Sequence, residues 1–332
     1  MRNGLAIGID AGGTKVAGLL VDCSSGGRVL ARAKAEMPAG DADRAVETTI
    51  AVGRELAGRP EASDGVGAVG IGAAGMIDLD GVMRFAPNIA WRDVALGPLV
   101  ADALDIVAYA DNDANVAAWG EFRFGAGRGS NDMLLVTVGT GIGGGIVAGG
   151  RLFRGAHGFG AEIGHIIVEP DGPLCGCGNH GCWEQVASGR AIDRLGRAAA
   201  LEHPDSILAS LNGGDTAAVR GTQVTEAARR GDRAALDVFE EVGRRLGEGI
   251  AGLVNVLDPD VVVVGGGAVV AGDLLLGPAR RAFGGTVEAP GHRPAVPMVP
   301  AALGTDAGAI GAADLALLRA RSGDVAVTNG GP

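Results

Sequence analysis

The chain has 332 residues, of which 47% are hydrophobic, and this size suits two domains with cores of their own. Its formal net charge of −11 excludes the basic surface expected of a nucleic-acid-binding protein. The first residues carry no apolar region of the signal-peptide kind. The most apolar run, residues 261–270, is too short and too rich in glycine to span a bilayer. We therefore expect a cytoplasmic protein that binds neither nucleic acid nor a membrane.

Glycine gathers in turns at the ends of apolar stretches. Residues 5–21 predict a strand, a glycine turn and a second strand, with Asp10 at the end of the first strand. Residues 134–147 repeat this pattern, and residues 261–267 predict a buried strand that ends in three glycines. The turns contain Gly12, Gly13 and Thr14, then Thr137, Gly139, Thr140 and Gly141, then Gly265, Gly266 and Gly267. Two similar hairpins about 130 residues apart indicate an internal duplication.

These glycine turns favour phosphate binding. Backbone N–H groups in such turns form concave anion sites, and the absence of a β-carbon lets phosphate oxygens approach the chain. Asp10 beside the first turn would suit Mg²⁺, which takes one or two carboxylates together with phosphates and water. A single glycine hairpin is usually only a tight turn, but here two hairpins and a third glycine patch occur together. The pattern differs from a P-loop, because a strand rather than a helix follows each turn.

A polar cluster follows the apolar residues 107–110 and precedes an alanine-rich helix pattern. The cluster contains Asp111, Asn112, Asp113 and Asn115. One of these residues would serve as the N-cap of the helix, but a cap does not need all four. A carboxylate at the end of a strand and the start of a helix is well placed to act as a general base toward a bound hydroxyl.

Three of the four cysteines lie within eight residues, at Cys175, Cys177 and Cys182, and His165 precedes them. One histidine and three cysteines form a complete tetrahedral zinc set with no open position, which is typical of a structural site. Disulfides are the alternative, but Cys175 and Cys177 are too close in sequence to pair without strain. His180 is a rival ligand to His165. The carboxylates Glu162 and Glu184 bracket the cluster and are not needed as ligands.

These motifs, in this order, resemble the ROK family of bacterial sugar kinases and sugar-responsive repressors. The residues that carry the resemblance are Asp10-Ala-Gly-Gly-Thr-Lys15, Asn112-Asp113-Ala-Asn115, Gly139-Thr-Gly-Ile-Gly-Gly-Gly145, Glu162-Ile-Gly-His165, Cys175 to Glu184, and Gly265-Gly-Gly267. The resemblance covers residues 5–315 and implies the two-domain α/β fold of the actin/hexokinase/Hsp70-like ATPases, with an inter-domain cleft. The segment Cys182-Trp-Glu-Gln is most similar to the corresponding segment of the ATP-dependent glucokinases of the family, particularly the actinobacterial ones. Val186 departs from the aromatic residue that they commonly carry.

The resemblance also implies roles for single residues. Asp113 would be the base toward the 6-hydroxyl of a hexose, while Asn88, Asn112, Glu162, His165 and Glu184 would bind the other hydroxyls. The three glycine turns would bind ATP, with Asp10, Gly12, Gly13 and Thr14 near phosphate and Mg²⁺ and residues 265–267 along the adenosine. His165 would bind both sugar and a structural Zn²⁺, and Cys175, Cys177 and Cys182 would complete the zinc site.

We therefore expect an ATP-dependent glucokinase that transfers the γ-phosphate of ATP to glucose. The alternatives are a ROK kinase for mannose, fructose or an N-acetylhexosamine, and a catalytically silent sugar-sensing protein. A smaller domain is expected over residues 1–113 with residues 305–332, and a larger one over residues 114–304. We expect a loop over residues 202–222, a disordered tail from Ser322, and a homo-oligomer, either a dimer or a tetramer.

Overall fold

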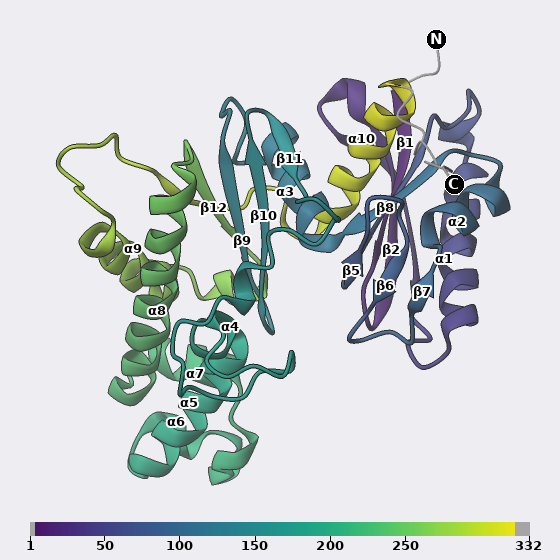
Figure 1. Ribbon diagram of the computed structural model, residues 1–332. Coiled ribbons are helices and arrows are strands. Elements are labelled where there is room, and N and C mark those ends of the chain that lie inside the picture. Colours follow the sequence, from purple (N-terminus) through teal and green to yellow (C-terminus); the bar gives the residue numbers. More distant parts are fainter. Residues whose placement is uncertain (1–3, 323–332) are drawn as a thin grey trace. The chain divides into compact units, whose positions relative to one another are not determined.

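The computed structural model describes residues 4–322 (Figure 1). Ser322 is the last residue of helix α10, Ala307–Ser322, whereas the rest of the predicted tail lies outside the described residues. In the described part of the chain, no helix combines the length and the apolar character needed to cross a membrane.

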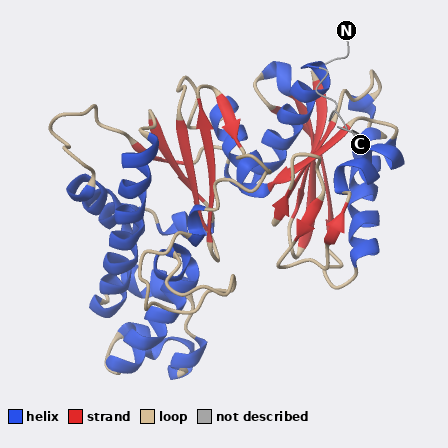
Figure 2. Cartoon of the chain, in the orientation of Figure 1, coloured by secondary structure: helices blue, strands red, loops and turns tan. Residues whose placement is uncertain are grey.

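The first sheet has the order β3-β2-β1-β4-β8, and Figure 2 draws its strands in red. Its strands are β1 Leu5–Ala11, β2 Lys15–Asp22, β3 Arg28–Glu36, β4 Val69–Ala73 and β8 Ala108–Asn112. Strands β1, β2 and β3 form an antiparallel meander, while β4 is parallel to both β1 and β8. The carboxyl ends of β1, β4 and β8 therefore meet at one edge of the sheet.

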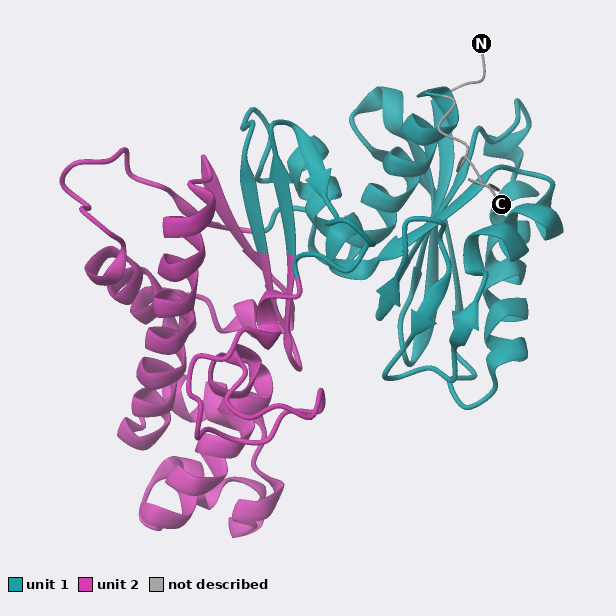
Figure 3. Ribbon diagram, viewed as in Figure 1, with its two compact units in different colours: residues 1–135, 145–161, 301–332 teal, residues 136–144, 162–300 magenta. Residues whose placement is uncertain are grey.

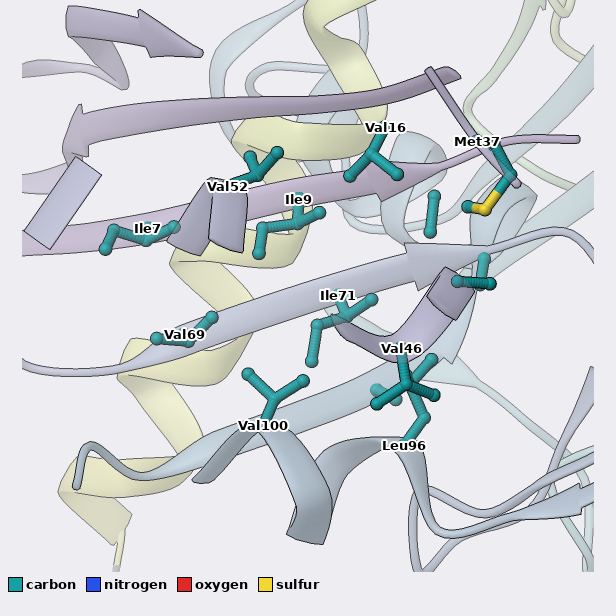
Figure 4. Packing of buried hydrophobic residues seen from close by; sticks show 14 of the residues in the cluster. Ile7, Ile9, Val16, Met37, Val46, Val52, Val69, Ile71, Leu96 and Val100 are labelled. Atoms are coloured by element: carbon teal, nitrogen blue, oxygen red, sulfur yellow. The ribbon is translucent and has the colours of Figure 1, made fainter. Parts of the chain in front are cut away.

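Helices cover both faces of this sheet because the side chains of β1 alternate between them. Ile7 and Ile9 point into a core that includes Val52 of α1, Ala42–Ala57, and Val100 of α2, Leu96–Leu104 (Figure 4). On the other face, Ala6 packs against the apolar side of α10.

Glycine lets α10 lie directly on that face. A β-carbon on Gly8 would lie 1.7 Å from the carbonyl oxygen of Ala309, and one on Gly70 would lie 1.9 Å from that of Ala312. Neither position therefore accepts a side chain.

The second sheet has the order β11-β10-β9-β12-β13. Its strands are β9 Met133–Val138, β10 Ile142–Ala148, β11 Arg151–Phe153, β12 Val261–Gly265 and β13 Met298–Pro300. A third sheet consists of β5 Met76–Ile77, β6 Met83–Phe85 and β7 Arg92–Val94, in that order. The three predicted strand-and-glycine-turn segments are therefore present.

Of the remaining helices, α3 follows β8, five lie between β11 and β12, and α9 lies between β12 and β13. They are α3 Asp113–Phe124, α4 Trp183–Ala187, α5 Gly189–Glu202, α6 Ile207–Ser210, α7 Gly221–Arg229, α8 Arg233–Leu257 and α9 Asp273–Thr286. The expected loop over residues 202–222 was partly wrong, because it contains α6. The side chain of Ser206 caps this short helix by accepting from the N–H of Ala209.

The chain forms two compact units (Figure 3). Unit 1 contains residues 1–135, 145–161 and 301–332, and unit 2 contains residues 136–144 and 162–300. Within unit 1, α3 crosses α10 closely, since a β-carbon on Gly311 would lie 1.8 Å from the carbonyl oxygen of Val116. The domain boundary expected at Asp113 stays a prediction.

Candidate functional site

The turn from β8 into α3 holds the polar cluster in unit 1. Asn112 is the N-cap of α3, because its Oδ1 accepts from the N–H groups of Ala114 at 2.9 Å and Asn115 at 3.1 Å. Its Nδ2 donates to the carbonyl oxygen of Gly75 at 3.1 Å. Asp113 is the next residue and is therefore free of the capping role.

Asp113 lies in an environment that disfavours its charged form. Burial raises the pKa of its carboxyl above the ordinary value, although Oδ1 accepts the N–H of Ala114 at 2.9 Å. Asp10, near the end of β1, lies close enough to Asp113 for the charge of Asp113 to affect its pKa. Burial and then the charge of Asp113 raise the pKa of Asp10 to about 6, against an opposing effect of Lys15. Two carboxylates with raised pKa values thus lie at one sheet edge, which favours a site that handles protons and a divalent cation.

Asp111 fixes the backbone beside Asp113. Its Oδ1 accepts from the N–H of Asn112 at 2.9 Å and from Nδ2 of Asn115 at 3.0 Å. Its Oδ2 accepts from Nε of Arg154 at 2.5 Å, and the pair is largely buried. Arg154 is 43 residues away in the sequence, and nothing in the local pattern pointed to this partner.

The first glycine turn in unit 1 adjoins the loop that carries Asn88. A β-carbon on Gly13 would lie 2.9 Å from Cβ of Asn88. The turn is closed by the N–H of Gly12, which donates to the carbonyl oxygen of Lys15 at 3.0 Å, and Thr14 is exposed. Asn88 and the predicted phosphate turn are therefore neighbours.

The second glycine turn, in unit 2, is closed by the N–H of Gly139, which donates to the carbonyl oxygen of Gly141 at 3.0 Å. The N–H of Gly189, at the start of α5, donates to the carbonyl oxygen of Gly139 at 2.8 Å. A β-carbon on Gly139 would meet no protein atom within 4 Å. Thr137 is half-buried in β9, and Thr140 is exposed in the turn. The space beside this turn is open to a ligand.

The third glycine patch lies against the second turn. Gly265 ends β12 and is buried. Gly266 has a φ of +88°, and a β-carbon there would lie 2.5 Å from the carbonyl oxygen of Val138. Gly267 has open space at its β-carbon position. The second and third glycine predictions therefore concern one region of unit 2.

The predicted zinc residues come together in unit 2. Ligand atoms of His165, Cys175, Cys177 and Cys182 lie within 4.8 Å of one another. The Sγ atoms of Cys177 and Cys182 are 3.6 Å apart, and Sγ of Cys175 is 3.7 Å from Nδ1 of His165. Tetrahedral zinc with Zn–S bonds of about 2.3 Å has ligand–ligand edges of about 3.8 Å, so the donor set fits the ion. His180 lies outside this group, with Nδ1 3.1 Å from the carbonyl oxygen of Gly172.

Glu184 lies between the zinc residues and the second glycine turn. Its Oε1 accepts from Sγ of Cys175 at 3.0 Å and from Nε2 of Gln185 at 3.2 Å. Its Oε2 would be 2.2 Å from a β-carbon on Gly141. Oε2 of Glu162 is 4.0 Å from Nε2 of His165. The three predicted sugar ligands of unit 2 are thus arranged around the cysteine cluster.

The comparisons with known proteins agree with these features. The chain matches the ROK family over residues 6–319. It is 42% identical over 316 residues to a glucokinase of Streptomyces coelicolor, covering 94% of this chain and 98% of the relative. It is 38% identical to a glucokinase of Thermotoga maritima, covering 93% and 96%.

A solved ROK glucokinase from Streptomyces griseus, in complex with glucose and AMPPNP, has a TM-score of 0.82 and 44% identity to this chain. The alignment covers 94% of this chain and 99% of that one. The predicted α/β fold of the actin-like ATPases is confirmed. The chain belongs to the ROK family.

Proposed function

We propose that this chain is an ATP-dependent glucokinase that transfers the γ-phosphate of ATP to the 6-hydroxyl of glucose. The observation that carries the proposal is the carboxylate of Asp113, which starts α3, is free of the capping role and has a raised pKa. Family membership and the similarity to glucokinases over nearly the full chain support it.

In this mechanism Asp113 accepts the proton of the 6-hydroxyl while the hydroxyl oxygen attacks the γ-phosphorus and the bond to ADP breaks. A base whose pKa is raised toward the working pH is a better proton acceptor than an ordinary aspartate. Asp111 and the cap at Asn112 hold the backbone on which Asp113 stands. Asn88 and Asn112 of unit 1 would bind other hydroxyls of the sugar.

Unit 2 would supply the remaining sugar ligands, Glu162, His165 and Glu184. Hydrogen bonds from sugar hydroxyls to carboxylates are each worth about 1.5–3 kcal/mol, more than those to neutral groups. The glycine turns of both units would bind the phosphates of ATP through their N–H groups, with residues 265–267 along the adenosine.

Two metal ions belong to this proposal. Asp10 would hold Mg²⁺ together with the phosphates, and the negative charge shared by Asp10 and Asp113 fits a divalent cation. Mg²⁺ supplies neutralisation of the charge on the phosphates when it is bound. Zn²⁺ held by His165, Cys175, Cys177 and Cys182 would keep the loop that carries Glu184 in place.

A panel of sugars and donors tests the proposal. With Mg²⁺, we expect ADP formation from ATP with glucose and a higher kcat/KM for glucose than for mannose, fructose or an N-acetylhexosamine. A better hexose would overturn the assignment of glucose. No ADP with any sugar would instead favour the sugar-sensing alternative, and faster turnover with polyphosphate would overturn ATP as the donor.

A second test uses the open space at Gly139. Gly139→Ala adds a methyl group that meets no protein atom within 4 Å, so the free energy of unfolding is expected to change little. The methyl group would occupy space beside the turn that a phosphate needs. We expect KM for ATP to rise about tenfold, equivalent to about 1.4 kcal/mol, with KM for glucose nearly unchanged.

Gly252→Ala in α8 is the matched control, because its β-carbon would also meet no protein atom within 4 Å. It should leave both KM values unchanged. Equal KM values for ATP in the wild type and Gly139→Ala would remove the second turn from the phosphate site.

A further inference from the structure

Arg92 in β7 forms hydrogen bonds to carbonyl groups of the loop that carries Asn88. Its Nη1 donates to the carbonyl oxygens of Trp91 at 2.6 Å and Ala86 at 2.7 Å, with a longer contact to that of Ile89 at 3.5 Å. Its guanidinium also lies over the ring of Phe85, 4.1 Å from the centroid. One side chain thus contacts both ends of the connection between β6 and β7.

The flanks of this loop are anchored in other ways. Trp91 is fully buried, and its Nε1 donates to the carbonyl oxygen of Ala42 at 3.1 Å. The N–H of Ala90 donates to the carbonyl oxygen of Ala39 at 2.8 Å, and Ile89 is buried. Asn88 is exposed at the outer part of the loop, against Gly13.

The carbonyl groups that Arg92 contacts converge on one point. Without a donor at that point, their dipoles repel and each carbonyl turns toward water, which changes the backbone angles between them. A guanidinium offers several N–H donors in a fixed plane and forms strong, charge-assisted bonds to such oxygens. Arg92 therefore contacts carbonyl groups on both sides of Asn88 in the sequence.

We propose that Arg92 is a positioning residue for sugar binding, which holds the loop of residues 86–91 so that the amide of Asn88 meets a sugar hydroxyl. The proposal rests on the function proposed above, in which Asn88 is a sugar ligand. Arg92 acts on affinity and on the choice of hexose, whereas the phosphoryl-transfer step depends on Asp113. The side chain of Arg92 would not itself touch the sugar.

Arg92→Met tests this role, because methionine keeps an unbranched chain over Phe85 and removes every donor. We expect KM and Kd for glucose to rise about tenfold, the effect of losing one well-placed hydrogen bond, while kcat and KM for ATP stay within about twofold. The preference for glucose over mannose should also decrease. Amide hydrogen exchange at residues 86–91 should become faster.

Arg84→Met is the matched control. Arg84 lies in the neighbouring strand β6 and is also an exposed arginine, but it pairs with the carboxylates of Asp78 and Asp93 instead of loop carbonyl groups. This variant should keep the wild-type KM for glucose. An equal rise in both arginine variants would assign the effect to the sheet in general and overturn the proposal.

Asn88→Ala separates the proposal from the function on which it rests. A raised KM for glucose in Asn88→Ala with a wild-type KM in Arg92→Met would overturn the positioning role alone. A wild-type KM in Asn88→Ala would remove Asn88 from the sugar site, and the proposed set of sugar ligands would then be wrong. A fall in kcat together with the melting temperature in Arg92→Met would show a purely structural role.

Discussion

Asp113→Asn is expected to lower kcat by about 10²–10⁴-fold, the usual contribution of a general base. Asparagine keeps the size of the side chain and an oxygen that can accept the N–H of Ala114, but it cannot take up the proton of the sugar hydroxyl. The cap of α3 is Asn112, so the melting temperature should change little. Steady-state kinetics with glucose and thermal unfolding of the same samples check both expectations.

Asp43→Asn is a matched control, because Asp43 is an exposed aspartate in the first turn of α1. It removes the same charge at the same kind of helix position and should leave kcat unchanged. If Asp113→Asn retained wild-type kcat, Asp113 would be only a residue of the first helical turn, and another group would have to be the base.

The pH dependence gives a second readout of the same carboxylate. Burial disfavours the charged form of Asp113, so the group stays protonated to a higher pH than an ordinary aspartate. A base works only when it is deprotonated, and kcat/KM of the wild type should therefore fall as the pH decreases through this raised pKa. An acid limb that persists in Asp113→Asn would belong to another group such as Asp10.

Loss of one zinc ligand is expected to release the ion and to weaken glucose binding. Wild-type protein should contain one zinc ion per chain, and Cys177→Ala should contain none, because a site of one histidine and three cysteines needs all four ligands. Glu184 and His165 then lose their fixed positions, and KM for glucose should rise more than KM for ATP. Elemental analysis measures the metal independently of activity.

Cys23→Ala is the matched control for this experiment. Cys23 follows β2 in unit 1 and is half-buried, and burial raises the pKa of its thiol to about 12. This variant should keep zinc and a normal KM for glucose. Wild-type protein without stoichiometric zinc would show that the ligand assignment is wrong, and a zinc-free Cys177→Ala protein with normal KM would separate zinc from the sugar site.

The sequence was most informative where structure depends on neighbouring residues. The strand and glycine-turn segments around Gly13, Gly139 and Gly266 could be predicted, because turn chemistry and strand alternation are local. The approach of the three cysteines to one another could be predicted for a similar reason, since three cysteines within eight residues leave few geometries. Their role as zinc ligands stays a prediction. The strand that ends in Asn112 and the helix that begins at Asp113 also followed from the local pattern.

The contacts that hold the site in place could not be predicted. Arg154, just after β11, meets Asp111 in β8 only through the tertiary fold, and no local pattern identifies that pair. The approach of Glu184 to Gly141, and the convergence of loop carbonyl groups on Arg92, likewise depend on tertiary geometry. The short helix α6 was missed because glycine and polar residues surround it and four residues carry little periodicity.

The close packing of α10 on β1 has a consequence for biosynthesis. Gly8 and Gly70 let the backbone of α10 cover one face of the first sheet, and that helix begins at Ala307. During translation, β1 is made about three hundred residues before α10. Strands β1 and β2 therefore have an uncovered apolar face, including Leu19 and Val21, until α10 has left the ribosome. This part of the first sheet is made long before its packing can be completed.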